Sequence, residues 1–228
     1  MRAKSPACQG LEVIRPFWHA RYDKAMEFVI DAFLPATLTS HPMSDEEFAA
    51  LCDKHPDLFF EMTAEAELLV MPPHHSLTGA QNSRISRQLD VWAEQDGRGI
   101  ACDSSTGFLL PSGARRSPDA SWTLKDRIAA LDPAIRKRYW HLCPDFVIEL
   151  QSTTDRPQVA RAKMQEWISN GAQLGWLIDP ERRAVTIYRL NGDVETRVDA
   201  VSIAGEGPVA GFILVLGPVW KPMGDLKV

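Results

Sequence analysis

Apolar and polar side chains alternate along several short segments, a pattern typical of β-strands with one buried face. These segments cover residues 58–62, 67–71, 100–103, 107–110, 118–123, 146–150, 174–178 and 184–189. Apolar side chains at spacings of three and four predict helices over residues 78–95 and 157–170. Ser44, with Glu47 three residues later, predicts a further helix that begins with a capping box. A basic helical stretch is predicted over residues 125–140.

The order of these elements indicates an α+β (mixed α/β) fold with one central sheet. Residues 1–43 are predicted to form an N-terminal extension, because four prolines interrupt this segment. Residues 44–228 then form the folded domain.

Composition supports an ordinary globular protein. The chain has 228 residues, of which 45% are hydrophobic and 24% charged, and it is long enough to bury a core without a structural metal or disulfides. Its longest apolar stretches are far shorter than the roughly 20 residues that a membrane-spanning helix needs. The four cysteines form no CxxC pair, which predicts reduced thiols and a cytoplasmic protein.

Charge is unevenly distributed along the chain. The net charge of −5 does not favour a protein that merely coats nucleic acid. Residues 44–67, however, hold eight acids and one lysine, whereas residues 115–138 hold seven Lys or Arg and three Asp. This asymmetry fits a basic groove beside an acidic site, and it also fits two solvated faces.

Three charged side chains fall at positions where the pattern predicts burial. Alternation places Asp119 and Glu149 on two apolar strands, and burying a carboxylate is costly unless it is paired or binds a metal. On the helix over residues 157–170, Lys163 lies in one stripe with Val159 and Trp167. Taken singly, each has a structural explanation. Asp119 or Glu149 could be a strand-end carboxylate that accepts from backbone donors, and Lys163 could extend its amine to solvent.

Together these side chains suggest phosphodiester chemistry. Two neighbouring carboxylates favour a divalent cation, and hard oxygen ligands suit Mg²⁺ or Mn²⁺. A lysine beside such a cation can orient water and stabilise negative charge on a phosphate. Asn82, on the inward side of the helix over residues 78–95, is a candidate hydrogen-bond donor to the same site.

Four blocks of sequence resemble a known family. Residues 117–122, 143–152, 162–167 and 170–180, in this order, are similar to the Uma-type restriction endonuclease domain of the PD-(D/E)XK nuclease superfamily. The resemblance extends over about residues 45–220. It implies a restriction-endonuclease-like fold, in which helices flank a central mixed β-sheet.

The resemblance also implies roles for individual residues. Asp119 and Glu149 would be metal ligands, and Glu67 would match an acid contributed from outside the two-strand motif, with Glu61 as a further candidate. The position two residues after the motif acid, usually lysine in the superfamily, is Gln151 here. Lys163 on the following helix matches the place to which the lysine has moved in this family.

The first hypothesis is therefore a Mg²⁺- or Mn²⁺-dependent DNA endonuclease. Asp119, Glu149 and Glu67 would hold the metal, while Lys163 and Gln151 would position the attacking water. Basic residues would hold the DNA backbone. These are Arg115, Arg116, Arg136, Lys137 and Arg138.

Two other functions stay open, and the assembly state is an expectation from the fold class. One is a catalytically inactive DNA-binding or assembly module, which the net charge and Gln151 favour. The other is a metal-dependent hydrolase of a smaller phosphate ester. Two sites that cut two strands would suit a homodimer.

Overall fold

The computed structural model describes residues 36–73, 75–152, 156–224 and 226, so most of the predicted extension lies outside the described residues. The helices are α2 (Asp45–Lys54), α3 (Ser76–Asp96), α4 (Lys125–Ala129), α5 (Pro157–Ser169) and α6 (Gly217–Trp220), with 3₁₀ turns η2 (Ile135–Lys137) and η3 (Gly207–Val209). The strands are β1 (Ala36–Thr39), β2 (Phe59–Met62), β3 (Glu67–Met71), β4 (Gly99–Asp103), β5 (Phe108–Leu109), β6 (Arg115–Arg116), β7 (Ala120–Leu124), β8 (Phe146–Leu150), β9 (Leu174–Asp179), β10 (Ala184–Arg189), β11 (Val194–Val198), β12 (Ser202–Ala204) and β13 (Ile213–Val215).

A six-stranded sheet in the order β11-β10-β9-β8-β7-β4 forms the centre of the fold. β8 and β9 pair in parallel, whereas the other neighbours pair antiparallel. Helix α5 connects β8 to β9, because parallel neighbours need a crossover connection. All five residues of β8 are buried, as expected for a central strand. The mixed sheet confirms the predicted fold class.

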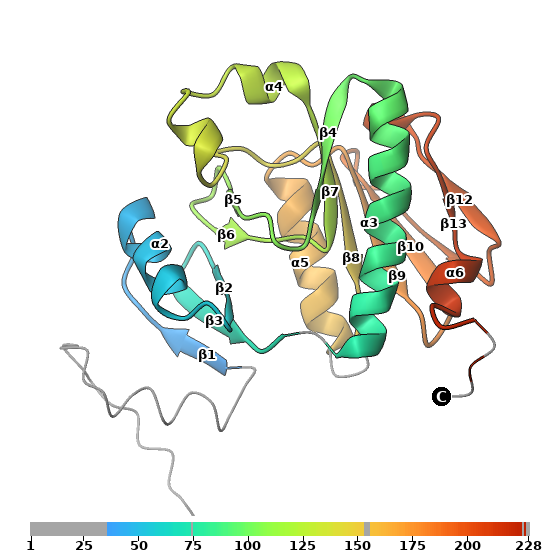
Figure 1. The fold of residues 1–228 in the computed structure, drawn as a ribbon, viewed down its shortest axis with the longest axis horizontal. Coiled ribbons are helices and arrows are strands. Elements are labelled where there is room, and N and C mark those ends of the chain that lie inside the picture. Colours follow the sequence, from blue (N-terminus) through green and yellow to red (C-terminus); the bar gives the residue numbers. More distant parts are fainter. Residues whose placement is uncertain (1–35, 74, 153–155, 225, 227–228) are drawn as a thin grey trace, which may run out of the picture. The chain divides into compact units, whose positions relative to one another are not determined.

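Helices α3 and α5 cover opposite faces of this sheet (Figure 1). The alternation predicted for β8 holds: Phe146 and Ile148 pack in the core with α3, whereas Val147 packs in the core with α5. Each face thus has its own hydrophobic core. Glu149, which shares a face with Val147, consequently points towards α5.

A second, five-stranded sheet has the order β1-β3-β2-β6-β5, and β12 and β13 form a separate pair. β1 lies within the segment predicted as an extension and pairs antiparallel with β3. Helix α2 begins as predicted, since the Ser44 side chain accepts from the Glu47 backbone NH and the Glu47 carboxylate accepts from that of Ser44. Among the described helices, none is long and apolar enough to cross a membrane.

One prediction about the middle of the chain was wrong, and one strand was not predicted. The basic stretch over residues 125–140 is not one helix: α4 ends at Ala129, and only the 3₁₀ turn η2 follows. Pro133 removes a backbone donor from this segment. Strand β6 was not predicted, because two consecutive arginines carry no alternation of apolar and polar residues.

Candidate active site

Glu149 and Lys163 lie side by side between the central sheet and α5. The Lys163 Nζ is 3.0 Å from Oε1 of Glu149, and the Trp167 indole NH donates to the same oxygen at 2.7 Å. Lys163 and Trp167 are one helical turn apart, so both reach the same face of the sheet. The lysine of the predicted apolar stripe is therefore directed to the motif acid.

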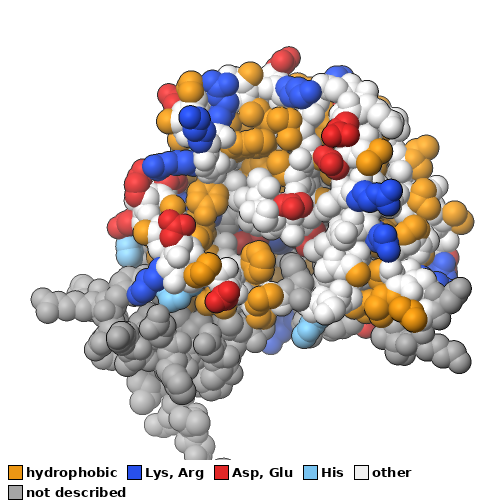
Figure 2. All heavy atoms as spheres, in the orientation of Figure 1, with side chains coloured by type: hydrophobic (Ala, Val, Ile, Leu, Met, Phe, Trp, Pro, Cys, Tyr) orange, Lys and Arg blue, Asp and Glu red, His pale blue; other side chains and the backbone are white. Residues whose placement is uncertain are grey.

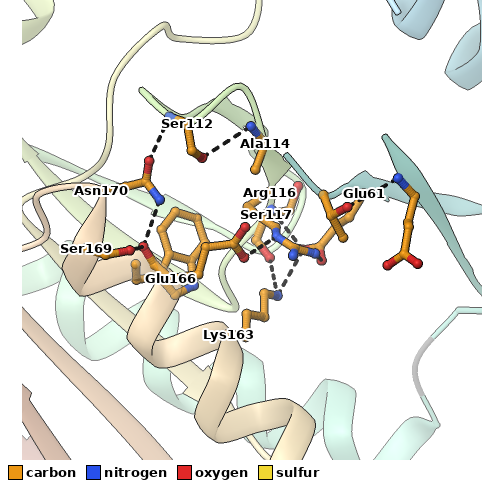
Figure 3. Close-up of polar contacts among 12 residues, drawn as sticks. Glu61, Ser112, Ala114, Arg116, Ser117, Lys163, Glu166, Ser169 and Asn170 are labelled. Atoms are coloured by element: carbon orange, nitrogen blue, oxygen red, sulfur yellow. Dashed lines mark hydrogen bonds and ion pairs between the residues drawn. The ribbon is translucent and has the colours of Figure 1, made fainter. Parts of the chain in front are cut away.

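A second acid, Glu61 of β2, contacts the other side of the lysine. Its Oε1 lies 2.9 Å from the Lys163 Nζ and accepts a hydrogen bond from the Ser117 backbone NH, also at 2.9 Å. The Ser117 carbonyl accepts from the Lys163 Nζ at 3.1 Å. The ammonium is thus held by two carboxylates and one carbonyl, as the close-up in Figure 3 shows in part.

Arg116 of β6 extends this network. Its guanidinium donates to Oε2 of Glu61 at 3.0 Å and to Oε2 of Glu166 at 2.7 Å (Figure 3). Arg116 and Glu61 are both buried, and a buried arginine needs such partners. The arginine therefore fixes Glu61 in front of the lysine.

Asp119 immediately precedes β7 and contacts α3. Its Oδ1 accepts from the Asn82 side-chain NH at 2.7 Å, and its Oδ2 accepts from the Leu150 backbone NH at 2.7 Å. The second bond ties Asp119 to the residue next to Glu149. Asp119 is buried, with 7% of its surface exposed. We refer to Asp119, Glu149, Glu61 and Lys163 as the acid–lysine cluster.

The pKa values show how closely these charges interact. Burial, with the charges of Asp119 and Glu61, raises the pKa of Glu149 to about 8, although Lys163 acts in the opposite direction. Burial also raises the pKa of Glu61, but Lys163 and Arg116 outweigh it and hold that pKa below its usual range. Burial lowers the pKa of Lys163, yet Glu149 and Glu61 more than compensate, so the amine stays charged.

Asp119 and Glu149 suit a divalent cation, because Glu149 is costly to ionise where it lies. A cation between the two carboxylates would remove that cost, and carboxylate oxygens are the ligands that Mg²⁺ and Mn²⁺ prefer. The buried Oδ1 of Asn82 has no hydrogen-bond partner among the described residues and offers a further oxygen beside Asp119. Across the described part of the chain, no three His, Cys, Asp or Glu residues form a ready-made metal site. Water or substrate would therefore complete the coordination.

The structure places two predicted site residues outside the acid–lysine cluster. Glu67 is exposed at the start of β3, where its backbone NH donates to the Thr63 hydroxyl. The place expected for its carboxylate is taken by Glu61. Gln151 follows β8 and is half-buried, and its backbone NH donates to the Ile178 carbonyl. No hydrogen bond between the Gln151 amide and the cluster is found within the described residues.

The basic residues proposed to hold DNA divide into two groups. Arg115 and Arg116 are buried and paired with acids, so the prediction that they bind the DNA backbone was wrong. Arg136, Lys137 and Arg138 are exposed at and after η2. Arg138 pairs with Glu46 at 3.1 Å, so Arg136 and Lys137 are the exposed members of this group best able to meet a phosphate backbone.

The sequence did not indicate that Trp167 and Arg116 contact the acids of the site. Trp167 was assigned only to the apolar stripe of its helix, and a tryptophan there gives no sign that its NH meets an acid. The signal that could have indicated this contact is that Trp167 lies one helical turn after Lys163. Arg116 gave the opposite signal, since arginines are usually exposed.

An open groove of about 630 Å³ runs between α3 and the turn that follows β4. Asn82 lies in its wall, and so do Ser83, Ser86, Arg87, Asp103 and Thr106. Figure 2 shows this face hollowed, with acidic and basic side chains at the floor. Because Asn82 donates to Asp119, the groove reaches the edge of the acid–lysine cluster.

Comparison with solved structures supports the fold. The chain is similar to a protein from Anabaena variabilis described as a putative nuclease belonging to DUF820, with a TM-score of 0.64 and 18% sequence identity. The similarity covers 79% of this chain and 99% of the other. No curated protein matches the chain.

A family model gives the clearer assignment. The model of the Uma2 family, described as "putative restriction endonuclease", matches residues 45–214. This range includes all members of the acid–lysine cluster and more than half of the chain. The chain therefore belongs to the Uma2 restriction endonuclease family.

Proposed function

We propose that this protein is a Mg²⁺- or Mn²⁺-dependent endonuclease that hydrolyses phosphodiester bonds in DNA. One observation carries the proposal: Asp119, Glu149 and Lys163 come from three separate segments and converge beside an open groove. Buried charges of this kind are costly to maintain, and perturbed ionisable groups are typical of functional sites. Membership of a restriction endonuclease family points to the same class of reaction.

Asp119 and Glu149 are the residues that would hold the metal. Mg²⁺, when bound, supplies charge stabilisation at the phosphate and makes water a stronger nucleophile. Asn82 and the Leu150 backbone NH hold the Asp119 carboxylate in one orientation. Such outer hydrogen bonds fix a ligand in place before the cation arrives.

Lys163 is the residue that would act on the phosphate. Its ammonium stays charged because of Glu149 and Glu61, so it can stabilise the negative charge that develops on the phosphoryl oxygens. Glu61 and the Ser117 carbonyl hold the amine in place without taking its proton. The position two residues after Glu149 is thus not needed for the positive charge, which accounts for an uncharged Gln151.

A non-catalytic module on the same fold is the second candidate. The observation that favours it is that the Lys163 amine already contacts four oxygens, one from Glu61, two from Glu149 and the Ser117 carbonyl. An ammonium held in this way would have to exchange one partner for a phosphate. Binding without cleavage would result if that exchange does not occur.

Cleavage of supercoiled plasmid with Mg²⁺ or Mn²⁺ distinguishes the two candidates. Asp119→Ala and Glu149→Ala are expected to abolish cleavage, whereas Glu67→Ala, at an exposed acid, is expected to cleave as the wild type does. Equal cleavage by all four proteins would exclude the acid–lysine cluster as the active site. Calorimetric titration with Mn²⁺ completes the test, since a folded protein that binds no metal and cuts nothing is the non-catalytic module.

A further inference from the structure

A small pocket lies beside the acid–lysine cluster, between the segment of α2 and β2 and the strands β5 and β6. We call it the aromatic pocket, because phenyl and phenol rings form much of its wall. Its volume is about 160 Å³. An engineered apolar cavity of about 150 Å³ binds one benzene molecule, so the aromatic pocket has room for a single ring. Ring-bearing side chains in its lining are Phe48, Phe59, Phe60, Phe108 and Tyr139.

The rings of the pocket are held in fixed positions. The Tyr139 ring packs on Gly107 so closely that a Cβ added to this glycine would lie 2.6 Å from it. Phe48 meets Tyr139 edge-on, with ring centroids 5.6 Å apart. The Tyr139 hydroxyl is 3.5 Å from the Cys52 sulfur on α2. A rigid aromatic wall of this kind offers a stacking surface to a planar ligand at low entropic cost.

Polar groups in the wall suit a ligand that is planar but not purely apolar. Ser104 and Ser105 are polar residues of the lining, and the Ser105 hydroxyl donates to the Asp103 carboxylate at 2.6 Å. Arg115 also lines the pocket, and its buried Nε–H has no acceptor among the described residues. Its guanidinium lies 5.2 Å from the centre of the Phe48 ring. Nucleobases combine a flat ring with carbonyl acceptors at its edge, and therefore match this lining better than a hydrocarbon ring does.

Two residues in the wall of the aromatic pocket contact the acid–lysine cluster. Arg116 and Ser117 line the pocket, and the same two residues contact Glu61. The Ser117 carbonyl also accepts from Lys163. A nucleotide whose phosphate lies at the cluster would therefore have its base within reach of the pocket.

We propose that the aromatic pocket binds one unstacked pyrimidine base of the nucleic-acid strand that is cleaved at the acid–lysine cluster. This inference rests on the proposed nuclease function. The substrate class is then DNA with an unpaired or extruded base, and not a uniformly paired duplex. Extruding a base costs least where it is already unpaired, so such sites are selected.

The test compares four end-labelled duplexes that differ at one position. They carry no bulge, a one-nucleotide thymine bulge, a one-nucleotide adenine bulge, or an abasic bulge with the same backbone. Binding is measured by fluorescence anisotropy with the full chain and Ca²⁺ in place of Mg²⁺. The thymine bulge is expected to bind at least about fivefold more tightly than the abasic bulge, since stacking on an aromatic side chain stabilises single bases to this extent. The adenine bulge is expected to bind more weakly than thymine, because a purine has two rings.

Variants at the pocket connect the preference to these residues. Cys52→Phe places a ring in the pocket and is expected to remove the preference for thymine, whereas Cys52→Ala leaves the space open and keeps it. Tyr139→Phe retains the ring and is expected to keep the preference. Tyr139→Ala should lose it, with far-UV circular dichroism to show that the fold is retained. Cys52→Phe provides the independent check if Tyr139→Ala does not fold.

The outcomes separate this inference from the proposed function. Equal binding of the thymine and abasic bulges, with the duplex still cleaved, would overturn the base pocket and leave the nuclease intact. Equal binding of thymine and adenine would overturn the assignment to a single-ring base. Binding of none of the four duplexes would instead count against DNA as the substrate.

Discussion

The Lys163 ammonium lies 3.0 Å from the Glu149 carboxylate, although the two residues belong to a helix and a strand that are separated along the chain. In the PD-(D/E)XK pattern that the sequence resembles, the lysine is usually two residues after the acid on the same strand. Here the lysine belongs to α5, which packs against the sheet. The position two residues after Glu149 is occupied by Gln151. The same local charge arrangement thus arises from a different element.

Replacement of Lys163 tests the role of its charge. Lys163→Met is expected to lower kcat for plasmid cleavage by about 10²–10³-fold, the effect of losing one stabilising donor at a reacting oxyanion. KM should change little, because the donor acts on negative charge that develops only in the transition state. Lys125→Met, at an exposed lysine that contacts the Gly97 carbonyl, is the matched control and should cleave normally. A similar kcat for Lys163→Met and wild type would assign the lysine to structure alone.

Asn82 is expected to act as a positioning residue through Asp119. Asn82→Ala removes the 2.7 Å hydrogen bond to Oδ1 and should lower metal affinity or activity by about 10–100-fold, as is usual for outer-shell partners. The expected signature is a shift of the Mg²⁺ concentration for half-maximal cleavage to a higher value. Gln81→Ala serves as the control, since Gln81 donates to the Val219 carbonyl and not to the cluster. An unchanged Mg²⁺ dependence would contradict the positioning role.

Glu149 makes stability fall as pH rises. Its pKa is about 8 in the folded protein against 4.5 for the free side chain, so between these values the folded state keeps a proton that the unfolded state has released. In metal-free buffer Glu149→Gln should match the wild type at pH 4 and become increasingly more stable than the wild type as the pH rises towards 8.5. Urea unfolding at several pH values measures this difference.

Glu61 and Glu67 provide a direct comparison of two acids on one hairpin. Glu61→Gln takes away the charge that holds both Lys163 and Arg116, so it should cost about 3–5 kcal/mol of stability and most of the activity. Glu67→Gln should affect neither, because Glu67 is exposed. Thermal unfolding and plasmid cleavage of the two variants give the answer. Loss of activity in Glu67→Gln with Glu61→Gln unaffected would reverse this assignment.

The sequence predicted the site where local periodicity determined the direction of a side chain. Alternation on β8 and helical spacing on α5 placed Glu149 and Lys163 on facing surfaces, and the ion pair follows from those two patterns. The sequence could not decide between Glu61 and Glu67, because strand alternation places both side chains on the same face of the β2–β3 hairpin. Only the position of Ser117 and Arg116 against β2 separates them.

The two arginines of β6 show a second limit. A pair of adjacent arginines is usually solvated, and composition gives no reason to bury them. In the fold they pair with Asp45, Glu61 and Glu166, which come from three elements far apart in the chain. Such long-range compensation of charge leaves no periodic trace in the sequence.

Lys163 also spans two sheets, since Glu61 belongs to the five-stranded sheet and Glu149 to the six-stranded one. The positions of the catalytic groups therefore depend on the packing between the two sheets. A slight local opening there would separate the amine from one acid while the core between α3 and the six-stranded sheet remains folded. On gentle warming, inactivation should consequently precede global melting.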